Sequence, residues 1–596
     1  MNTPAHRDWQ DRIGQASGEI TPAARPALEA PTGLRAVPGG GAVTLTWDPV
    51  PGAIGYLVHR DGVPVGQPDV DVPAVPSCRY VDTGYGPAAY AVAALSAMDA
   101  IGPLSAAVHA APAATRGEVS LRVDASRVTR PLPRPWTSMV GSEHLSYLLE
   151  TGETGGRPIG AELTEALRIM RDELGVETVR AHGILCDDLG VYKEGDVYDF
   201  SGVDAVYDTV VGLGLRPIVE LGFMPRDLAA DPSKTVFAYE AIVSPPKDYE
   251  AWGDLVRALV EHLAERYGIH ELVDHWAFEV WNEPNLAVFW SGTPEEYFLL
   301  YDVTAAAVKN VHPGLRVGGP ASAANGWVEE LLAHVAESGA ALDFLSTHTY
   351  GNAPLDWRPA LDRYHRDVPI WWTEWGPTPT HFHGVGDGPF GAAFVLHGMK
   401  SAAGRIAALS HWVASDHFEE LGRPPRLFHG GFGLLTVGNL RKPRFHALSL
   451  AARLGDHELP ATSDGDVAGV EAWAARHDDG RIGVLVWNGT LNHTQAAGAP
   501  ELARTITLTV GGLDGDRWTL THHRIDGDHS NIEAVWQAMG GGDWPAGEQW
   551  DKLHSANTVD ELHPPVTVTG DTATLRFDLP MPGVSFIEAT PVRTGP

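Results

Sequence analysis

The sequence contains little cysteine, few basic residues for its size and no long apolar run. Its two cysteines, Cys78 and Cys186, fall in different predicted domains, so we expect neither a disulfide nor a thiolate-based zinc site. The net charge of −33 argues against nucleic acid and anionic membranes as partners, because both require a basic face. No stretch of apolar residues is long enough to predict a transmembrane helix. The first twenty residues hold no signal-peptide core, so we expect a cytoplasmic protein unless a leader has been removed.

The 596 residues exceed what one hydrophobic core can serve, and the patterning predicts several domains. Residues 1–29 are polar and rich in Ala and Pro, which predicts a disordered arm. Residues 30–112 and 456–596 alternate apolar with polar positions between Gly- and Pro-rich turns, which is typical of β-sandwiches. Residues 113–130 are interpreted as a linker whose Gly117–Val123 stretch adds a strand to the C-terminal sandwich.

Residues 131–455 instead alternate strands with helices, the pattern of a (β/α)₈ TIM barrel. Helical periods such as Thr164–Leu174 and Leu255–Tyr267 each end at a glycine, a common helix stop. The eight predicted strands are Trp136–Gly141, Glu177–His182, Arg216–Phe223, His275–Asn282, Arg316–Ser322, Asp343–Tyr350, Pro369–Trp375 and Leu409–Ser415. Catalytic residues of such barrels lie at the carboxyl ends of the strands.

Two glutamates occupy that position on strands that face each other across the barrel. Asn282 and Glu283 follow the fourth strand, which Pro284 ends because proline lacks an N–H for the ladder. Glu374 ends the seventh strand. A single glutamate at this rim is more often a structural acceptor, but the pair together points to glycoside hydrolysis.

That reaction needs one carboxylic acid to protonate the leaving oxygen and one carboxylate to attack the sugar. The first needs a raised pKa, whereas the second stays ionised through hydrogen bonds. We predict carboxyl groups roughly 5–5.5 Å apart, the separation of retaining enzymes.

Further segments of the chain resemble known protein families. Over residues 116–596 the chain resembles glycoside hydrolase family 39, the β-xylosidase and α-L-iduronidase family, and over about 31–111 it resembles a fibronectin type III module. The family resemblance is carried by Asn282–Pro284, Arg180–Gly183 with Asp187 and Asp188, Pro217–Pro225, His348–Tyr350, Trp412–Glu420, Phe428–Leu434 and Asn531–Trp536.

The resemblance implies a role for each matching residue. Glu283 is the acid/base and Glu374 the nucleophile, and Asn282 holds the 2-hydroxyl of the sugar. Tyr350 lies near Glu374 and Arg180 supports it. The expected ligands of the other sugar hydroxyls are His182, His348, Glu419 and Glu420, and the expected apolar walls are Phe223, Phe289 and Trp412.

The predicted function is exo-acting, retaining hydrolysis of a carbohydrate, and the resemblance favours a β-xyloside. An exo-glycosidase acting on arabinose- or galactose-containing side chains is an alternative, because the loop Pro377–His383 departs from the usual sequence of xylosidases. A uronic acid is less favoured, since the loop Gly351–Trp357 offers no basic clamp. A catalytically silent carbohydrate-binding protein is the alternative of another class. We predict no cofactor and no metal, because His381 and His383 lack a third ligand at metal-like spacing.

Overall fold

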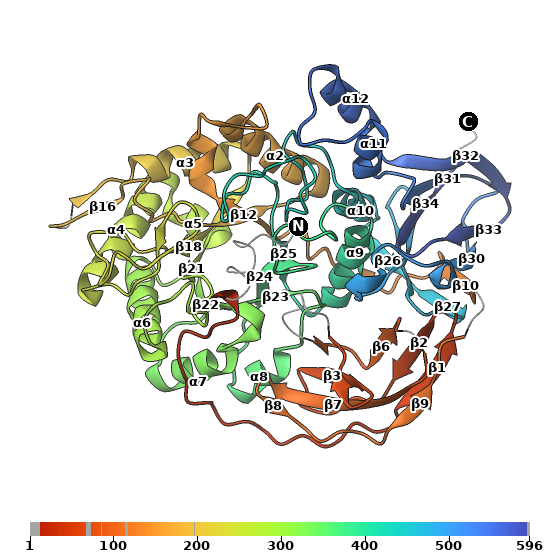
Figure 1. The fold of residues 1–596 in the computed structure, drawn as a ribbon, viewed down its shortest axis with the longest axis horizontal. Helices are drawn as coiled ribbons and strands as arrows, with labels where there is room; N and C mark the ends of the chain where they lie inside the picture. Colours follow the sequence, from red (N-terminus) through yellow and green to blue (C-terminus); the bar gives the residue numbers. More distant parts are fainter. Residues whose placement is uncertain (1–11, 67–72, 85, 114–116, 196, 593–596) are drawn as a thin grey trace.

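Eight parallel strands close into a barrel in the middle of the chain (Figure 1), which confirms the predicted TIM barrel. The computed structural model describes residues 12–66, 73–84, 86–113, 117–195 and 197–592. The barrel strands are β12 (Val140–His144), β15 (Thr178–His182), β18 (Arg216–Leu221), β21 (Ala277–Val280), β22 (Val317–Ser322), β23 (Phe344–Tyr350), β24 (Ile370–Gly376) and β25 (Ala408–His411). The first strand starts four residues later than predicted, because the Thr137 and Trp136 region forms a turn in which the Thr137 N–H donates to Arg134 O.

Helices surround the barrel, and their ends follow the local sequence. Asp248 accepts hydrogen bonds from the first turn of its helix, and Thr293 forms a capping box with Glu296. Gly175 adopts the left-handed conformation that ends a helix. The helices are α2 (Ile159–Leu174), α3 (Ser201–Gly212), α4 (Tyr249–Tyr267), α5 (Ile269–His275), α6 (Pro294–Val311), α7 (Val328–Ser338), α8 (Arg358–Arg363), α9 (Phe390–Ala402) and α10 (Pro443–Ala452). None of the helices in the described ranges is both long and apolar enough to span a bilayer.

Two antiparallel sheets precede the barrel and share a core that includes Leu45, Trp47, Tyr56 and Tyr90. One sheet holds β1 (Arg35–Gly39), β2 (Ala42–Thr46) and β6 (Arg79–Asp82). The other holds β3 (Gly55–Arg60), β4 (Val63–Pro64), β5 (Ala74–Val75), β7 (Ala88–Ala97), β8 (Ala100–Ile101) and β9 (Val108–Ala110). This part is a β-sandwich; its resemblance to a fibronectin type III module stays a prediction.

A second sandwich follows the barrel. Its smaller sheet has the order β27 (Ala461–Gly465), β10 (Gly117–Asp124), β30 (Arg504–Gly511) and β33 (Thr572–Leu579). Its larger sheet has the order β11 (Arg130–Pro131), β26 (His457–Leu459), β28 (Val470–Arg476), β29 (Ile482–Asn488), β34 (Gly583–Pro591), β31 (Arg517–Ile525) and β32 (Asp560–Thr569). Two helices, α11 (Ile532–Ala538) and α12 (Glu548–Ala556), lie at one end of it (Figure 1). β10 is parallel to β30, so a strand that precedes the barrel lies inside this sandwich.

The prediction of a disordered N-terminal arm is wrong from residue 12 onward; residues 1–11 lie outside the described ranges. The arm runs beside the barrel near β22 and α7 before it reaches the first sandwich (Figure 1). Ala16 forms a β-bridge with Leu286, and Arg25 is ion-paired with Asp99 and Glu330. These contacts attach the arm to the barrel and to the first sandwich, a partner set that composition does not reveal.

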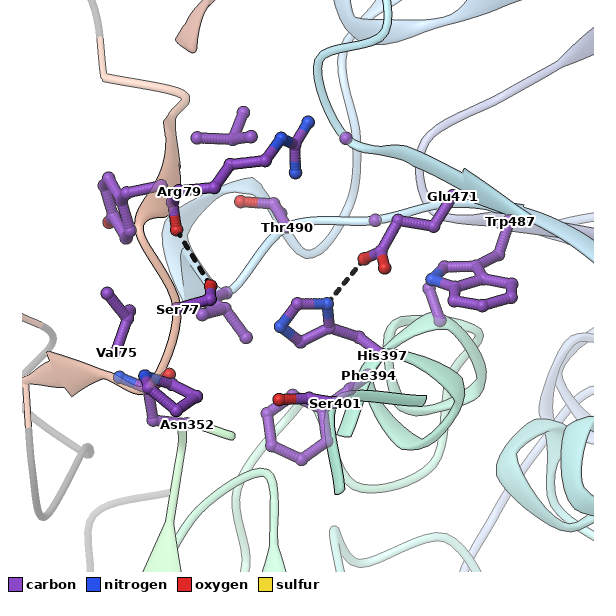
Figure 2. Close-up of a pocket in the computed structure, with 17 residues that line it drawn as sticks. Val75, Ser77, Arg79, Asn352, Phe394, His397, Ser401, Glu471, Trp487 and Thr490 are labelled. Carbon is purple, nitrogen blue, oxygen red and sulfur yellow. Dashed lines mark hydrogen bonds and ion pairs between the residues drawn. The ribbon is translucent and has the colours of Figure 1, made fainter. Parts of the chain in front are cut away.

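The two sandwiches and the barrel meet around His397 of α9 (Figure 2). His397 Nδ1 lies 2.5 Å from Glu471 Oε1 of β28, beside Arg79 of the first sandwich. Burial acts to raise the pKa of Glu471, but the charge of His397 and its hydrogen bond outweigh burial and lower the pKa to about 2. On the opposite wall, Asn352 Nδ2 donates to Ala74 O of β5 at 2.7 Å. Polar contacts therefore hold the three parts together.

Glu471→Gln should lower the free energy of unfolding by about 1–3 kcal/mol at pH 7. The depressed pKa means that this stabilisation is complete above the ordinary pKa of 4.5 and is lost as pH falls from there toward about 2. Urea unfolding of both proteins at pH 7 and pH 4 measures it, and the difference between them should shrink at the lower pH. Glu118→Gln is the control, because Glu118 pairs with Arg576 on the open surface of the same sandwich and should change stability by less than about 0.5 kcal/mol. An equal loss in both variants, or a loss independent of pH, would contradict the assignment.

Candidate active site

A pocket opens at the carboxyl ends of the barrel strands, and both predicted catalytic glutamates line it. Glu283 and Glu374 are only 8% and 5% exposed, so their carboxyl groups are largely removed from bulk water. The other lining residues are Ile13, His182, Asn282, Leu286, Phe289, Ala323, Ala324, Tyr350, Pro379, Trp412, Glu420 and Phe432.

Glu283 projects from the turn that ends the fourth strand, β21. Its φ of 42° is the left-handed conformation that side chains other than glycine seldom adopt. The turn is fixed because the Glu283 N–H donates to Ala321 O at 2.9 Å. The carboxylate Oε1 accepts from His348 Nδ1 at 2.8 Å.

Glu374 lies inside β24 and is held on both carboxylate oxygens. Arg180 Nη1 donates to Oε1 at 2.5 Å, and the Tyr350 hydroxyl donates to Oε2 at 2.8 Å. Burial raises the pKa of Glu374 above its ordinary value, while the charge of Arg180 and the hydrogen bond from Tyr350 oppose the rise. Both contacts favour the ionised form that a nucleophile requires.

The two carboxyl groups are close enough for a covalent mechanism. An oxygen of Glu283 and an oxygen of Glu374 lie within 4.8 Å of each other. His348 Nδ1 is 3.8 Å from Glu374 Oε1. Retaining enzymes place their carboxyl groups roughly 5–5.5 Å apart, whereas inverting enzymes leave roughly 6.5–9.5 Å for a water molecule. This oxygen-to-oxygen approach agrees with the shorter, retaining separation.

Arg180 is fully buried beneath the pocket and joins several acidic groups. Besides Glu374, it contacts Glu220 at 2.7 Å and Glu279 at 2.8 Å, and its Nη2 donates to Asn282 Oδ1 at 2.9 Å. Burying a guanidinium is costly unless its donors are paired, and here carboxylates and an amide oxygen accept from it. One cation thus orients both Glu374 and Asn282.

His182 lies between this network and the pocket. Burial, together with the nearby charge of Arg180, lowers the pKa of His182 to about 3, so the imidazole is neutral. Its Nδ1 is 2.8 Å from Glu220 Oε2, and its Nε2 lies 3.7 Å from Glu420 Oε1 and 3.8 Å from Glu374 Oε1. Because the Nδ1–H donates to the carboxylate, Nε2 presents a lone pair toward the pocket.

Glu420 is the third carboxyl group of the pocket. Burial, and then the negative charges of Glu143, Glu374 and Glu283, raise the pKa of Glu420 well above its ordinary value. The protonated form can both donate and accept hydrogen bonds, which suits it to a sugar hydroxyl. Trp412 and Phe289 form apolar walls where the sequence places them.

Three predicted contacts to the sugar differ from what the structure places in the pocket. The ring nitrogens of His348 are taken by Glu283 and by Thr373 Oγ1 at 3.0 Å, so His348 acts on Glu283 from below. Phe223 is fully buried and packs against His182 and Trp281 behind the pocket wall.

Glu419 points out of the pocket. It accepts from the Tyr147 hydroxyl at 3.2 Å and from Arg423 Nε at 2.9 Å. Adjacent residues of an irregular loop can face opposite ways, so the sequence alone did not separate Glu419 from Glu420.

The sequence reasoning missed other lining residues. Phe432 belongs to the Phe428–Leu434 motif, which predicts no role for it, and Pro379 belongs to the loop Pro377–His383. Ile13 carried no signal, because it lies in a segment without periodicity.

Two groups among the described residues bring possible metal ligands within 4.8 Å of one another. One is the Glu283, His348 and Glu374 group, in which His348 is already bonded to Glu283, and Glu374 to Arg180 and Tyr350. The other joins His144, Cys186 and Asp188. Burial raises the pKa of the Cys186 thiol, and a protonated thiol is a poor metal ligand.

Comparison with known proteins agrees with this geometry. The model of "Glycosyl hydrolases family 39" matches residues 119–361 and 357–573. The chain belongs to this family. It is therefore a glycoside hydrolase with a carbohydrate substrate, and the family is one of retaining enzymes.

Individual relatives extend over most of the chain. It is 33% identical to a β-xylosidase of Geobacillus stearothermophilus over 457 residues, which cover 71% of this chain and 86% of the relative. It is also 33% identical to a β-xylosidase of Caldicellulosiruptor saccharolyticus, with 71% and 88% covered. The crystal structure of a monomeric β-xylosidase from Caulobacter crescentus CB15 superposes with a TM-score of 0.69 at 30% identity, covering 80% of this chain and all of the other.

Tyr350→Phe should lower kcat by about tenfold to a hundredfold, because the hydroxyl holds Glu374 Oε2 in the ionised, aligned form. The loss of this hydrogen bond raises the pKa of Glu374, so the acidic limb of kcat/KM should move to higher pH. A pH–rate profile measures both effects. Tyr301→Phe is the matched control: its buried hydroxyl donates to Ala341 O on the outside of the barrel, and its profile should not move. An unshifted acidic limb in Tyr350→Phe would mean that Tyr350 does not control Glu374.

Proposed function

We propose that the protein is an exo-acting β-xylosidase in which Glu283 is the acid/base and Glu374 the nucleophile. The close approach of these two carboxyl groups at the rim carries the mechanism. The β-xylosidase relatives at 33% identity support the sugar. A pocket enclosed by Trp412, Phe432 and Phe289 suits attack on a terminal residue of a chain.

In the first step, Glu374 attacks the anomeric carbon while Glu283 delivers its proton to the leaving oxygen. The bond to the leaving group breaks as the ester to Glu374 forms. Arg180 and Tyr350 position the attacking carboxylate through the two hydrogen bonds that they donate to it. Asn282, fixed by Arg180, offers its amide to the 2-hydroxyl.

In the second step, Glu283 is a carboxylate and takes a proton from the water that attacks the glycosyl ester. The ester bond breaks, and Glu374 leaves as a carboxylate that Arg180 stabilises. His348, with a neutral ring bonded to Glu283 and Thr373, keeps the acid/base oriented in both steps. The anomeric configuration is retained because each step inverts it once.

The charges around the pocket favour a neutral sugar. Three of the lining residues are glutamates, and Arg180 is the nearest cation in the surrounding network. Its guanidinium is already bonded to Glu220, Glu279 and Glu374. A uronate carboxylate would therefore lie beside the charged Glu374, and the described part of the pocket offers it no free basic partner.

An arabinose- or galactose-directed activity with the same mechanism remains the second candidate. Pro379, in the loop after Glu374 that departs from the xylosidase pattern, reaches the pocket. The loop therefore contributes to the lining of the pocket that binds the sugar. The mechanism is the same for either sugar.

Glu374→Ala should lower hydrolysis of p-nitrophenyl β-D-xyloside by at least about 10⁴-fold. Added azide should restore release of p-nitrophenol and give an inverted glycosyl azide, because azide fills the space of the lost carboxylate. Product NMR identifies the configuration. A product of the opposite configuration, or no rescue together with retained activity, would remove Glu374 as the nucleophile.

Glu283→Gln should slow substrates with poor leaving groups far more than p-nitrophenyl glycosides, because only the former need a proton. Glu419→Gln is the matched control on the same rim and should stay within about threefold of the unaltered enzyme, since its side chain points away from the pocket. Steady-state rates on xylobiose and the aryl xyloside measure the contrast. Full activity of Glu283→Gln on xylobiose would refute its role.

Turnover of an arabinoside or galactoside in place of the xyloside would keep the mechanism and change the sugar. Binding without turnover of any glycoside would instead favour a catalytically silent carbohydrate-binding protein.

The enzyme should hydrolyse 4-methylumbelliferyl β-D-xyloside at least about a hundredfold faster than the corresponding α-L-iduronide or β-D-glucuronide. The sugar carboxylate would meet the charge of Glu374 without a free cation, because Arg180 is already paired. Raising the salt concentration should not remove the preference, because the charges are buried. Comparable kcat/KM on a uronide would show that a basic group reaches the pocket.

A further inference from the structure

We propose that the N-terminal arm forms part of the catalytic site and that Ile13 is a wall of the subsite that holds the leaving group. This proposal rests on the proposed acid/base role of Glu283. Ile13 is the one lining residue, among those the structure describes around the pocket, that comes from ahead of the barrel. It is half-buried against the barrel core.

The arm is fastened to the loop that carries the acid/base. The Ser17 N–H donates to Asn285 O at 3.1 Å, and the Ala287 N–H donates to Gln15 O at 2.8 Å. The Ser17 hydroxyl donates to Pro284 O at 2.7 Å. These are antiparallel β contacts to the residues directly after Glu283, so the arm and the acid/base loop form one unit.

Further contacts hold the arm along the barrel. Gly18 lies against Pro294 at the start of α6, where a Cβ would come within 3.0 Å of the proline ring. Arg25 is paired with Glu330 of α7 and with Asp99, 2.7 Å away, in the first sandwich. Ile20 packs against the barrel core between these points. The arm is thus also anchored along the stretch that follows residues 15–17.

The position of Ile13 identifies the subsite. A general acid must touch the leaving oxygen, so the leaving group lies on the Glu283 side of the pocket. Leu286, whose backbone bridges to Ala16, donates its N–H to Glu283 O at 3.0 Å, and Phe289 donates its N–H to Leu286 O, so both belong to the turn that carries Glu283, and both line the pocket. Glu374, the proposed nucleophile, is held by hydrogen bonds from Tyr350 and Arg180.

Ile13, Leu286 and Phe289 give this side an apolar surface. Such a surface suits the flat or C–H-rich face of a leaving group, such as an aromatic ring or a second pyranose. Residues 1–118 precede the region that the family model matches. The arm therefore supplies this chain with a specificity element that the family core does not contain.

Ile13→Ala should lower kcat/KM for p-nitrophenyl β-D-xyloside by about three- to tenfold and leave that for β-D-xylosyl fluoride within about twofold. The value of kcat/KM reports the glycosylation step, in which the leaving group is still bound. Fluoride is too small to contact Ile13, whereas the aryl ring reaches it. Ile13→Trp should lower kcat/KM for xylobiose more than for the fluoride, because the larger side chain fills the subsite.

Ile20→Ala is the matched control: the same truncation on the same arm, away from the pocket. It should leave the ratio of kcat/KM for the aryl xyloside to kcat/KM for the fluoride unchanged, and likewise the ratio for xylobiose to the fluoride. Equal losses on the aryl glycoside and the fluoride in Ile13→Ala would indicate a disturbed acid/base loop and would overturn the subsite. No change on either substrate would also overturn it. If the enzyme prefers another sugar, the aryl glycoside and the glycosyl fluoride of that sugar give the same comparison of kcat/KM values. An error in the proposed sugar is therefore separable from an error in the proposed subsite.

Discussion

The active site depends on one buried cation. Arg180 lies in the barrel interior with its guanidinium bonded to carboxylates of three different strands and to Asn282. Without it, Glu220, Glu279 and Glu374 would face one another in a region of low dielectric, where like charges cost several kcal/mol. With it, the same carboxylates become a rigid frame in which Glu374 is oriented and Asn282 is held beside it. The arrangement of the proposed nucleophile is therefore a consequence of charge neutralisation inside the barrel.

How far the sequence predicts this site depends on whether a role is set by position along a strand or by contacts across the fold. The place of Glu283 and Glu374 in the pocket is predictable because strand ends define the rim, and proline marks the end of the fourth strand. Arg180 and Tyr350 were placed beside Glu374 by family resemblance, and the hydrogen bonds bear out that position. The barrel was found because strand and helix periods alternate along the chain.

The errors concern direction and distance. His348 belongs to the site but turns both nitrogens toward protein groups, and periodicity does not report which neighbour a ring meets. Phe223 lies one layer behind the wall that it was expected to form. Ile13 reaches the pocket through backbone pairing with residues more than 260 positions later, which no local pattern can encode. The arm looked disordered because its partners are elsewhere in the chain.

The parallel pairing of β10 with β30 has a topological consequence. β10 ends at Asp124, before the barrel begins, and β30 starts at Arg504, after it has ended. The barrel is thus an insertion within the sandwich. The strands just before it, β10 and β11, also pair with the strands just after it, β27 and β26, so the entry and exit of the barrel lie side by side. The sandwich cannot form until nearly the whole chain has been synthesised. Once formed, it restrains both ends of the barrel together.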